Sequence, residues 1–284
     1  MRWAAALLAA AAFPATAATA ANDEALWYLQ LDNDVPFGTD RWYTSGVRLA
    51  RVANGIEWGV VQEIYTPEAK KWHRGVADRA PTGRLLLSLA RHDVTPAAFQ
   101  TLEVMAGVRG PSAHGREAAE TIHQVIPAPF VDWTRQLPDE FDATLVASRS
   151  QSAWGPMKLH FGAQLGTQVV FVHAGFEARV SGAPQSAGRL LRFAATPEAA
   201  KDAGWSAYAG ASARGVGRNE LLSANYDVGG AALKRETMVT RIAAGVAWSA
   251  RWGAVTFDLA QDSREFEQQR EPHRFGSLAV QVSF

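Results

Sequence analysis

The segment from Leu31 to Gly46 concentrates side chains that could do chemistry near the start of the chain. It holds three aspartates, the amide of Asn33 and the hydroxyl groups of Thr39, Thr44 and Ser45. Carboxylate and amide oxygens are ligands that calcium prefers, and hydroxyl groups orient neighbours through hydrogen bonds. The same composition is typical of a polar hairpin loop, because Asn, Asp, Gly and Pro favour turns for backbone reasons. Both interpretations, a loop and a site, stay open from this segment alone.

His123 is the leading candidate for a general base. We expect an amphipathic helix over residues 112–126, because Ala118, Ile122, Val125 and Ile126 recur at helical spacing and prolines follow. His123 lies off this apolar stripe, and Glu120 stands one turn before it on the same face. Imidazole titrates near neutral pH and can take a proton from water. The alternative is a surface histidine without a role.

The chain offers oxygen and nitrogen ligands but no thiol, because it contains no cysteine. It also lacks the Gly-x-Ser-x-Gly turn that presents a nucleophilic serine. A water molecule activated by histidine, with a hard cation stabilising the oxyanion, needs only the groups that are present.

The end of the chain indicates what positions these residues. Leu278, Val280, Val282 and Phe284 alternate with small or polar residues, which resembles the closing strand of a bacterial outer-membrane barrel. Such a strand shows apolar side chains to lipid and polar ones to the lumen, with a period of two. A half-buried strand of a soluble sandwich is the alternative.

Similar segments recur along the chain and predict an all-β fold, a transmembrane antiparallel β-barrel of about 12 strands with a short helix in an outer loop. Their even number fits a closed barrel without open edges. Aromatic residues near their ends suit the interfacial girdles, namely Trp27, Tyr43, Trp58, Trp154, Trp205, Trp248 and Trp252. The expected strands lie near 25–33, 43–53, 56–64, 82–92, 98–108, 139–150, 157–165, 168–180, 203–216, 236–249, 252–264 and 273–284.

The first residues predict export. Arg2, an apolar run from Ala4 to Phe13 and small residues at 18–20 are typical of a secretory signal peptide over residues 1–20, with the barrel over 21–284. No later run is apolar for long enough to form a membrane-spanning helix. The net charge of 0 and the absence of a basic run argue against nucleic acid as a partner.

Several motifs in order resemble the lipid A 3′-O-deacylase family of outer-membrane enzymes. They span about residues 27–142. Beyond them only the barrel-like alternation supports the resemblance. The chain departs from the family pattern at Ala119, where Gln is usual. The motifs are Asn33-Asp34, Thr39-Asp40-Arg41-Trp42-Tyr43-Thr44-Ser45-Gly46, Gln62-Glu63-Ile64-Tyr65-Thr66-Pro67 with Asp78-Arg79, Gly107-Val108-Arg109-Gly110-Pro111-Ser112, His123, and Trp133-Thr134-Arg135-Gln136-Leu137-Pro138-Asp139-Glu140.

The resemblance implies calcium-dependent hydrolysis of the 3′-acyloxyacyl ester of lipid A at the outer-leaflet rim of a barrel in the Gram-negative outer membrane. It implies a catalytic set of Asn33, Asp34, Thr44 and His123. In the inferred mechanism His123 is the general base on water. Asp34, helped by Asn33, holds Ca²⁺, and Thr44 orients His123 or a ligand. We also expect a monomer whose partners are lipopolysaccharide and outer-membrane lipid.

Cationic side chains at the rim should bind the phosphates of lipid A. Lys70, Lys71 and Arg79 lie between the third and fourth expected strands and are the candidates, although an ordinary solvated loop has the same composition. Two other functions stay open. One is an outer-membrane phospholipase or esterase acting on another acylated lipid, and the other is a porin-like barrel without enzymatic activity.

Overall fold

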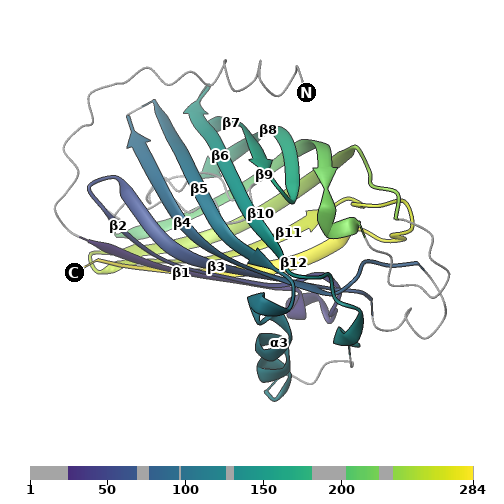
Figure 1. Cartoon of the computed structure of the whole chain (residues 1–284). Helices are drawn as coiled ribbons and strands as arrows, with labels where there is room; N and C mark the ends of the chain where they lie inside the picture. Colours follow the sequence, from purple (N-terminus) through teal and green to yellow (C-terminus); the bar gives the residue numbers. More distant parts are fainter. Residues whose placement is uncertain are drawn as a thin grey trace.

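The chain forms a closed barrel of antiparallel strands (Figure 1). The computed structural model describes residues 25–68, 77–95, 97–125, 131–180, 203–223 and 233–283. Each strand in this part of the chain pairs with its sequence neighbours, and β1 closes the barrel against β12 with Leu26 opposite Ser283 and Asn33 opposite Gly276. The prediction of a closed barrel of twelve strands is confirmed. The strands are β1 Leu26–Asn33, β2 Trp42–Ala53, β3 Ile56–Thr66, β4 Thr82–Val94, β5 Ala98–Arg109, β6 Glu140–Ser152, β7 Met157–Gly166, β8 Val169–Val180, β9 Gly204–Asn219, β10 Met238–Ala250, β11 Gly253–Asp262 and β12 His273–Ser283.

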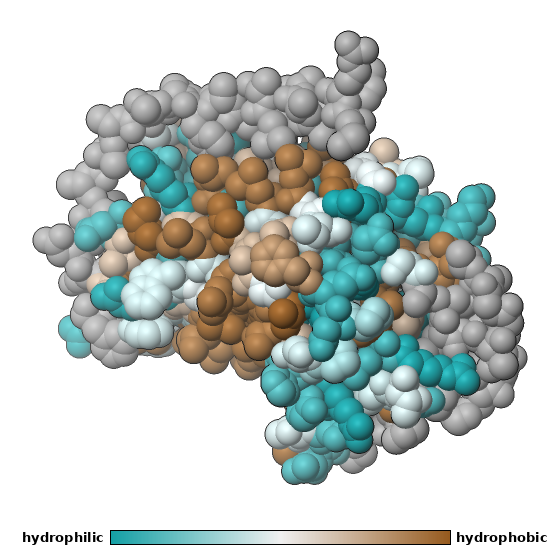
Figure 2. All heavy atoms as spheres, viewed as in Figure 1, coloured by the Kyte–Doolittle hydropathy of each residue, from teal (hydrophilic) through white to brown (hydrophobic). Residues whose placement is uncertain are grey.

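Alternation along each strand separates the two faces of the wall. In β1, Tyr28, Gln30 and Asp32 point inward and are buried. Trp27 and Leu31 point outward with more than two fifths of their surface exposed. Figure 2 shows the result as a band of hydrophobic surface over the strands, with hydrophilic surface over the loop end and the helix. Apolar side chains on the outside of a closed barrel suit contact with lipid.

The two ends of the barrel differ in their connections. Tight turns such as Asn54–Gly55 lie at the end where β1 begins and β12 ends, and Asn54 and Gly55 adopt the positive φ angles, 53° and 74°, of a two-residue hairpin. The opposite end carries most of the longer connections, and we call it the loop end. Within the described residues, no helix combines the length and apolar character needed to cross a membrane. The short helices all lie at the loop end and are η1 Val35–Phe37, η2 Pro111–Ala113, α3 Gly115–His123, η3 Trp133–Arg135 and η4 Glu220–Leu222.

The helix predicted over residues 112–126 is shorter than expected. Pro111–Ala113 form a separate 3-10 turn, and His114 then adopts a φ of 53°, so α3 begins only at Gly115. It ends at His123, and residues 126–130 lie outside the described part of the chain. His123 therefore occupies the last helical position rather than the middle of a longer helix.

The aromatic residues match the predicted girdle with one correction. Trp27, Trp58, Trp154 and Trp205 are exposed on the outer surface, and Trp248 lies between Trp205 and Trp252 with ring centroids 6.4 and 5.5 Å away. Tyr43 was predicted to belong to the same girdle, but it is fully buried inside the barrel. Its hydroxyl donates to Asp32 Oδ2 at 2.9 Å. A bulge follows it in β2, so the alternation seen further along the strand does not apply to Tyr43.

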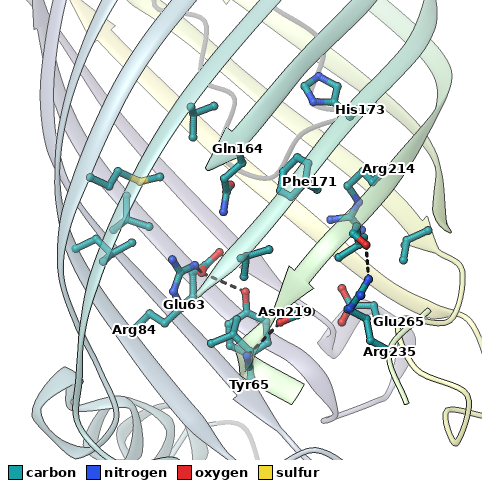
Figure 3. A pocket seen from close by; sticks show the side chains of 18 of the residues that line it. Glu63, Tyr65, Arg84, Gln164, Phe171, His173, Arg214, Asn219, Arg235 and Glu265 are labelled. Carbon is teal, nitrogen blue, oxygen red and sulfur yellow. Dashed lines mark hydrogen bonds and ion pairs between the residues drawn. The ribbon is translucent and has the colours of Figure 1, made fainter. Parts of the chain in front are cut away.

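The barrel interior is filled by buried ion pairs that reach across strands. Arg48 contacts both Glu57 and Glu103, the latter at 2.8 Å, and Arg84 contacts both Glu63 and Asp142, the latter at 2.7 Å. A cavity of about 120 Å³ remains near the loop end, lined by residues that include Glu63, Arg84 and His173 (Figure 3). Many inward charges suit a pore, whereas a filled interior suits an enzyme whose site lies elsewhere. Here the charges are numerous, but they are paired with one another.

Candidate active site

Helix α3 packs on the outside of the barrel wall rather than over its opening (Figure 1). Ile64 of β3 points away from the lumen and forms a buried cluster with Ala119, Val131 and Trp133. Gln62, which also points outward, donates its side-chain NH to the carbonyl oxygen of Ala113 at 2.8 Å. On the sequence these β3 residues look like lipid-facing positions, yet at the loop end the helix covers them.

The helix approaches the wall most closely where two glycines meet. A Cβ added to Gly115, the first residue of α3, would lie 2.8 Å from the Cα of Gly83 in β4. A Cβ added to Gly83 would lie 2.9 Å from the Cα of Gly115. Distances below 3.0 Å leave no room for a side chain, so this contact requires glycine on both elements. The pair fixes how near the helix comes to the strands.

A groove of about 380 Å³ lies between α3 and the outer face of β2 and β3. Its floor is apolar on the wall side, where Val47 and Ile64 lie, and Ala118 and Ile122 face it from the helix. The open rim carries polar groups. A groove of this kind accepts a chain that is apolar along its length and polar at one end. The remaining lining residues are Ser45, Gln62, His114, Glu117 and Thr121.

Asp34 sits at the end of β1, where the chain turns into the 3-10 helix η1. Its Oδ2 accepts hydrogen bonds from Thr39 Oγ1 at 2.7 Å and from the backbone NH of Arg41 at 3.0 Å. Its Oδ1 is buried and has no hydrogen-bond donor among the described residues. Burial raises the pKa of Asp34 to about 8. A buried carboxylate with one unused oxygen is a position that favours a cation.

Asn33 has a local structural contact. Its Oδ1 accepts a hydrogen bond from the backbone NH of Val35 at 2.7 Å, which holds the start of the turn. A carbonyl oxygen has two lone pairs, so this bond leaves room for a second partner. Asn33 and Asp34 are thus adjacent and both present oxygens at the turn, as the sequence predicts.

Thr44 lies at the bulge of β2, between Tyr43 and Ser45. Its hydroxyl is buried and hydrogen-bonds with the hydroxyl of Thr66 at the end of β3. Within the described residues it makes no hydrogen bond to His123, so its expected role in orienting that histidine has no direct contact behind it. Just before it, Trp42 adopts a φ of 61°, which is strained for a bulky residue.

His123 contacts an acid that the sequence reasoning did not select. Its Nε2 is 3.7 Å from Oδ2 of Asp40, in the loop between β1 and β2. The expected neighbour Glu120 instead accepts a hydrogen bond from Arg116 at 2.8 Å. Burial raises the pKa of the Asp40 carboxyl, and the charge of His123 opposes that rise. In the sequence, Asp40 could have been selected from its place in the motif that also holds Thr39 and Thr44.

Arg41 braces this loop. Its guanidinium donates to Glu68 and Glu271, each at 2.8 Å, and lies 4.3 Å from the ring centroid of Trp42. These partners belong to the connections that follow β3 and β11. Arg41 therefore ties three loops together beside Asp34 and Asp40, while its charge is committed to other acids.

The predicted phosphate-binding residues have different outcomes. Lys70 and Lys71 lie outside the described residues. Arg79 does not face the outer surface as expected, because its side chain is fully buried inside the mouth of the barrel. It stacks on Tyr65 at 4.3 Å and pairs with Glu265 at 3.2 Å. Burial in this ionic cluster, rather than exposure at the rim, accounts for the difference.

Asp34 and Asn33 are the candidate ligands for a metal ion. No three His, Asp or Glu side chains gather into a metal-binding group in the described part of the chain. The unused Oδ1 of Asp34 and the second lone pair of Asn33 Oδ1 fit a hard cation in type. A cation held there would complete its coordination with backbone or hydroxyl oxygens, water or substrate.

A closed antiparallel barrel with an apolar outer band and a polar interior is the architecture of an outer-membrane protein, and here it carries a polar cluster on the outside of its wall. The family described as "Outer membrane protein LpxR" matches residues 3–284. The chain belongs to this family, which confirms the family resemblance found in the motifs and the location in the outer membrane.

Solved structures agree on the fold. LpxR from Salmonella typhimurium superposes with a TM-score of 0.71 at 18% identity, covering 92% of this chain and 100% of that one. At this identity the likeness establishes the fold alone. The toluene transporter TodX of Pseudomonas putida gives a TM-score of 0.40 at 11% identity, covering 93% of this chain and 90% of that one, and carries no argument. No curated protein sequence matches the chain.

Proposed function

We propose that this protein is a lipid A deacylase that hydrolyses the 3′-acyloxyacyl ester with His123 as the general base. One observation carries the proposal. His123 ends a helix on the outside of the barrel, lies next to the buried acid Asp40, and directly follows Ile122, which lines an apolar groove. An acylated lipid in the outer leaflet reaches such a groove without entering the lumen. Membership of the LpxR family supports this choice of substrate.

The proposed chemistry uses one water molecule. His123 takes a proton from water as the water oxygen attacks the ester carbonyl carbon. The protonated imidazole then gives this proton to the departing alkoxide oxygen as the carbon–oxygen bond breaks. The products are a free acyloxyacyl acid and a lipid with a free 3′-hydroxyl. The apolar floor of the groove at Val47 and Ile64 holds the acyl chain and places the ester near the polar rim.

We propose calcium as the cofactor, with Asp34 and Asn33 as its protein ligands. When bound, it would supply a Lewis acid that polarises the ester carbonyl and stabilises negative charge on its oxygen. The chain's contribution is to hold two oxygens at the end of β1, one of them buried without a donor. Thr44, through Thr66, keeps the strand end beside them in place.

Substrate phosphates require cations near the groove. Lys70, Lys71 and Arg79 stay our candidates for this contact, and of these Arg79 is buried and paired with Glu265. On the helix Glu117 and Glu120 are acidic and Arg116 is paired with Glu120, so we expect the basic counterpart to come from the neighbouring loop.

The test is mass spectrometry of lipid A from cells that express this chain, with His123→Ala as the control. Loss of the mass of an acyloxyacyl group with the intact chain, and not with the variant, would support the proposal. Unchanged lipid A in both, with the folded barrel present in the outer membrane, would refute it. Phospholipids from the same cells are analysed in parallel, because released lysophospholipid would point to another acylated lipid as substrate.

A further inference from the structure

Asp40 is a buried carboxylate whose charge is balanced by no arginine or lysine among the described residues. Its side chain keeps only 8% of its surface exposed, and neither of its oxygens has a hydrogen-bond donor in the described part of the chain. The guanidinium of the neighbouring Arg41 pairs with Glu68 and Glu271 instead. Burying a carboxylate without hydrogen bonds costs free energy, so we expect a neighbouring group to compensate its charge.

The imidazole of His123 is that partner by position. Its Nε2 faces Oδ2 of Asp40 at 3.7 Å, and a quarter of the histidine side chain stays exposed toward solvent. This separation exceeds a hydrogen bond, which needs about 2.7–3.2 Å between nitrogen and oxygen. Catalytic hydrogen bonds are often long before substrate binds and shorten in the complex.

The loop that carries Asp40 is held on both sides. Thr39 donates its hydroxyl proton to Asp34, and the backbone NH of Arg41 donates to the same carboxylate. Helix α3, which carries His123, and the loop between β1 and β2, which carries Asp40, are therefore anchored separately. The pairing of Asp40 with His123 is the contact in which they meet.

We propose that Asp40 is the positioning residue for His123, a role that rests on the proposed function. Its carboxylate accepts the Nε2 proton of His123, which leaves Nδ1 as the nitrogen that takes the proton from water. As that proton arrives, the imidazole becomes a cation and the carboxylate stabilises it without being protonated itself. The proton then passes from Nδ1 to the departing alkoxide, so the Asp40 carboxylate stays unprotonated throughout.

The test compares the steady-state kinetics of the purified full-length barrel on lipopolysaccharide in detergent. We expect Asp40→Asn to lower kcat by about 10²–10⁴-fold, with KM changing much less, because only the transition state carries the imidazolium. Asp40→Glu should recover part of this loss, because it restores a carboxylate. Combining Asp40→Asn with His123→Ala should be no worse than His123→Ala alone, since both act through one group.

The control is Asp93→Asn, an aspartate on β4 whose carboxylate pairs with the exposed Arg91. It should leave kcat and KM unchanged. Calorimetric titration with calcium supplies a second readout, and we expect Asp40→Asn to bind calcium as the unaltered chain does. Heat-dependent migration in SDS gels establishes that each variant is folded.

The outcomes separate this inference from the proposed function. An active His123→Ala variant would sink the proposed function itself. An inactive His123→Ala together with a nearly fully active Asp40→Asn would overturn only the positioning role. A loss in Asp40→Asn that appears in KM alone, or as weakened calcium binding, would also overturn it, because Asp40 would then act on substrate or metal. If Asp40→Asn does not fold, the folded Asp40→Glu variant is used instead. A kcat of Asp40→Glu no higher than that of His123→Ala would then count against the positioning role.

Discussion

Replacing Gly115 by alanine separates local helix propensity from the packing of α3 on the barrel wall. Considered as part of a helix alone, the substitution should help, because alanine is favoured over glycine by up to about 1 kcal/mol. The structure predicts the opposite. The new Cβ would lie 2.8 Å from the Cα of Gly83 and 3.2 Å from its nitrogen, both backbone atoms of a strand in the closed barrel.

The size of the effect follows from these distances. Carbon atoms in contact lie about 3.5–4.0 Å apart, so relief of the 2.8 Å contact moves the start of α3 outward by about 0.7–1.2 Å. Overpacking of this kind costs about 1–3 kcal/mol, which outweighs the gain in propensity. Because His123 is the last residue of the same helix, it moves too. A misplacement of about 1 Å can cost about 10²-fold in rate.

The assay measures the initial rate of acyl release from lipopolysaccharide by mass spectrometry, with heat-dependent gel migration as the readout of the folded barrel. We expect Gly115→Ala and Gly83→Ala each to lower the rate by about 10–10²-fold without unfolding the barrel. Arg116→Ala, an exposed position in the same turn, should stay within about twofold of the unaltered chain. A Gly115→Ala protein as active as the unaltered chain would refute the reasoning.

Four further predictions concern the loop end and the interior. Asp34→Ala should nearly abolish deacylation and blunt its dependence on calcium, as should chelation of calcium in the unaltered chain, and full activity of Asp34→Ala at low calcium would show that the metal assignment is wrong. Arg41→Met removes a cation that pairs with Glu68 and Glu271, so the loop before β2 should lose about 1.5–3 kcal/mol of local stability and be cleaved faster in limited proteolysis. Arg48→Met leaves Glu57 and Glu103 buried without their cation, which should cost about 3–5 kcal/mol in the free energy of unfolding, measured as a lower urea midpoint. The unaltered barrel should show no porin-like conductance in planar bilayers, because the arginines of its described interior are paired with acids that fill the lumen. Open-channel currents would contradict that interpretation of the lumen.

The strands could be predicted from the sequence because their signal is local. Alternation in β1 and in the last strand follows from the period of two that any half-apolar strand must have, and it gave both their positions and their faces. Tyr43 shows where this reasoning fails. It sits where an aromatic girdle residue would be expected, but the bulge after it turns its side chain inward toward Asp32. A bulge of this kind has no signature in the alternation itself.

The sequence predicts which candidate residues lie near one another better than it predicts their contacts. Asn33, Asp34 and Thr44 lie within one segment of sequence, and the hairpin between β1 and β2 brings them together without help from the rest of the chain. The partner of His123 is different. Glu120 is the local choice, one helical turn away, whereas Asp40 reaches His123 only because α3 packs on the outer face of β3. The sequence pattern of a helix does not determine which strands the helix will pack against.

The ion pairs inside the barrel also support the site on its outer wall. Buried charges inside the barrel are paired between nearby strands, and Arg48 and Arg84 each bind acids from two other strands. Such pairs couple neighbouring strands and oppose local shifts of the wall. The outer faces of β3 and β4 are thereby held as a stiff surface on which Ile64 and Gly83 position α3. The helix then holds His123 close to Asp40, as the proposed role of His123 as a general base requires.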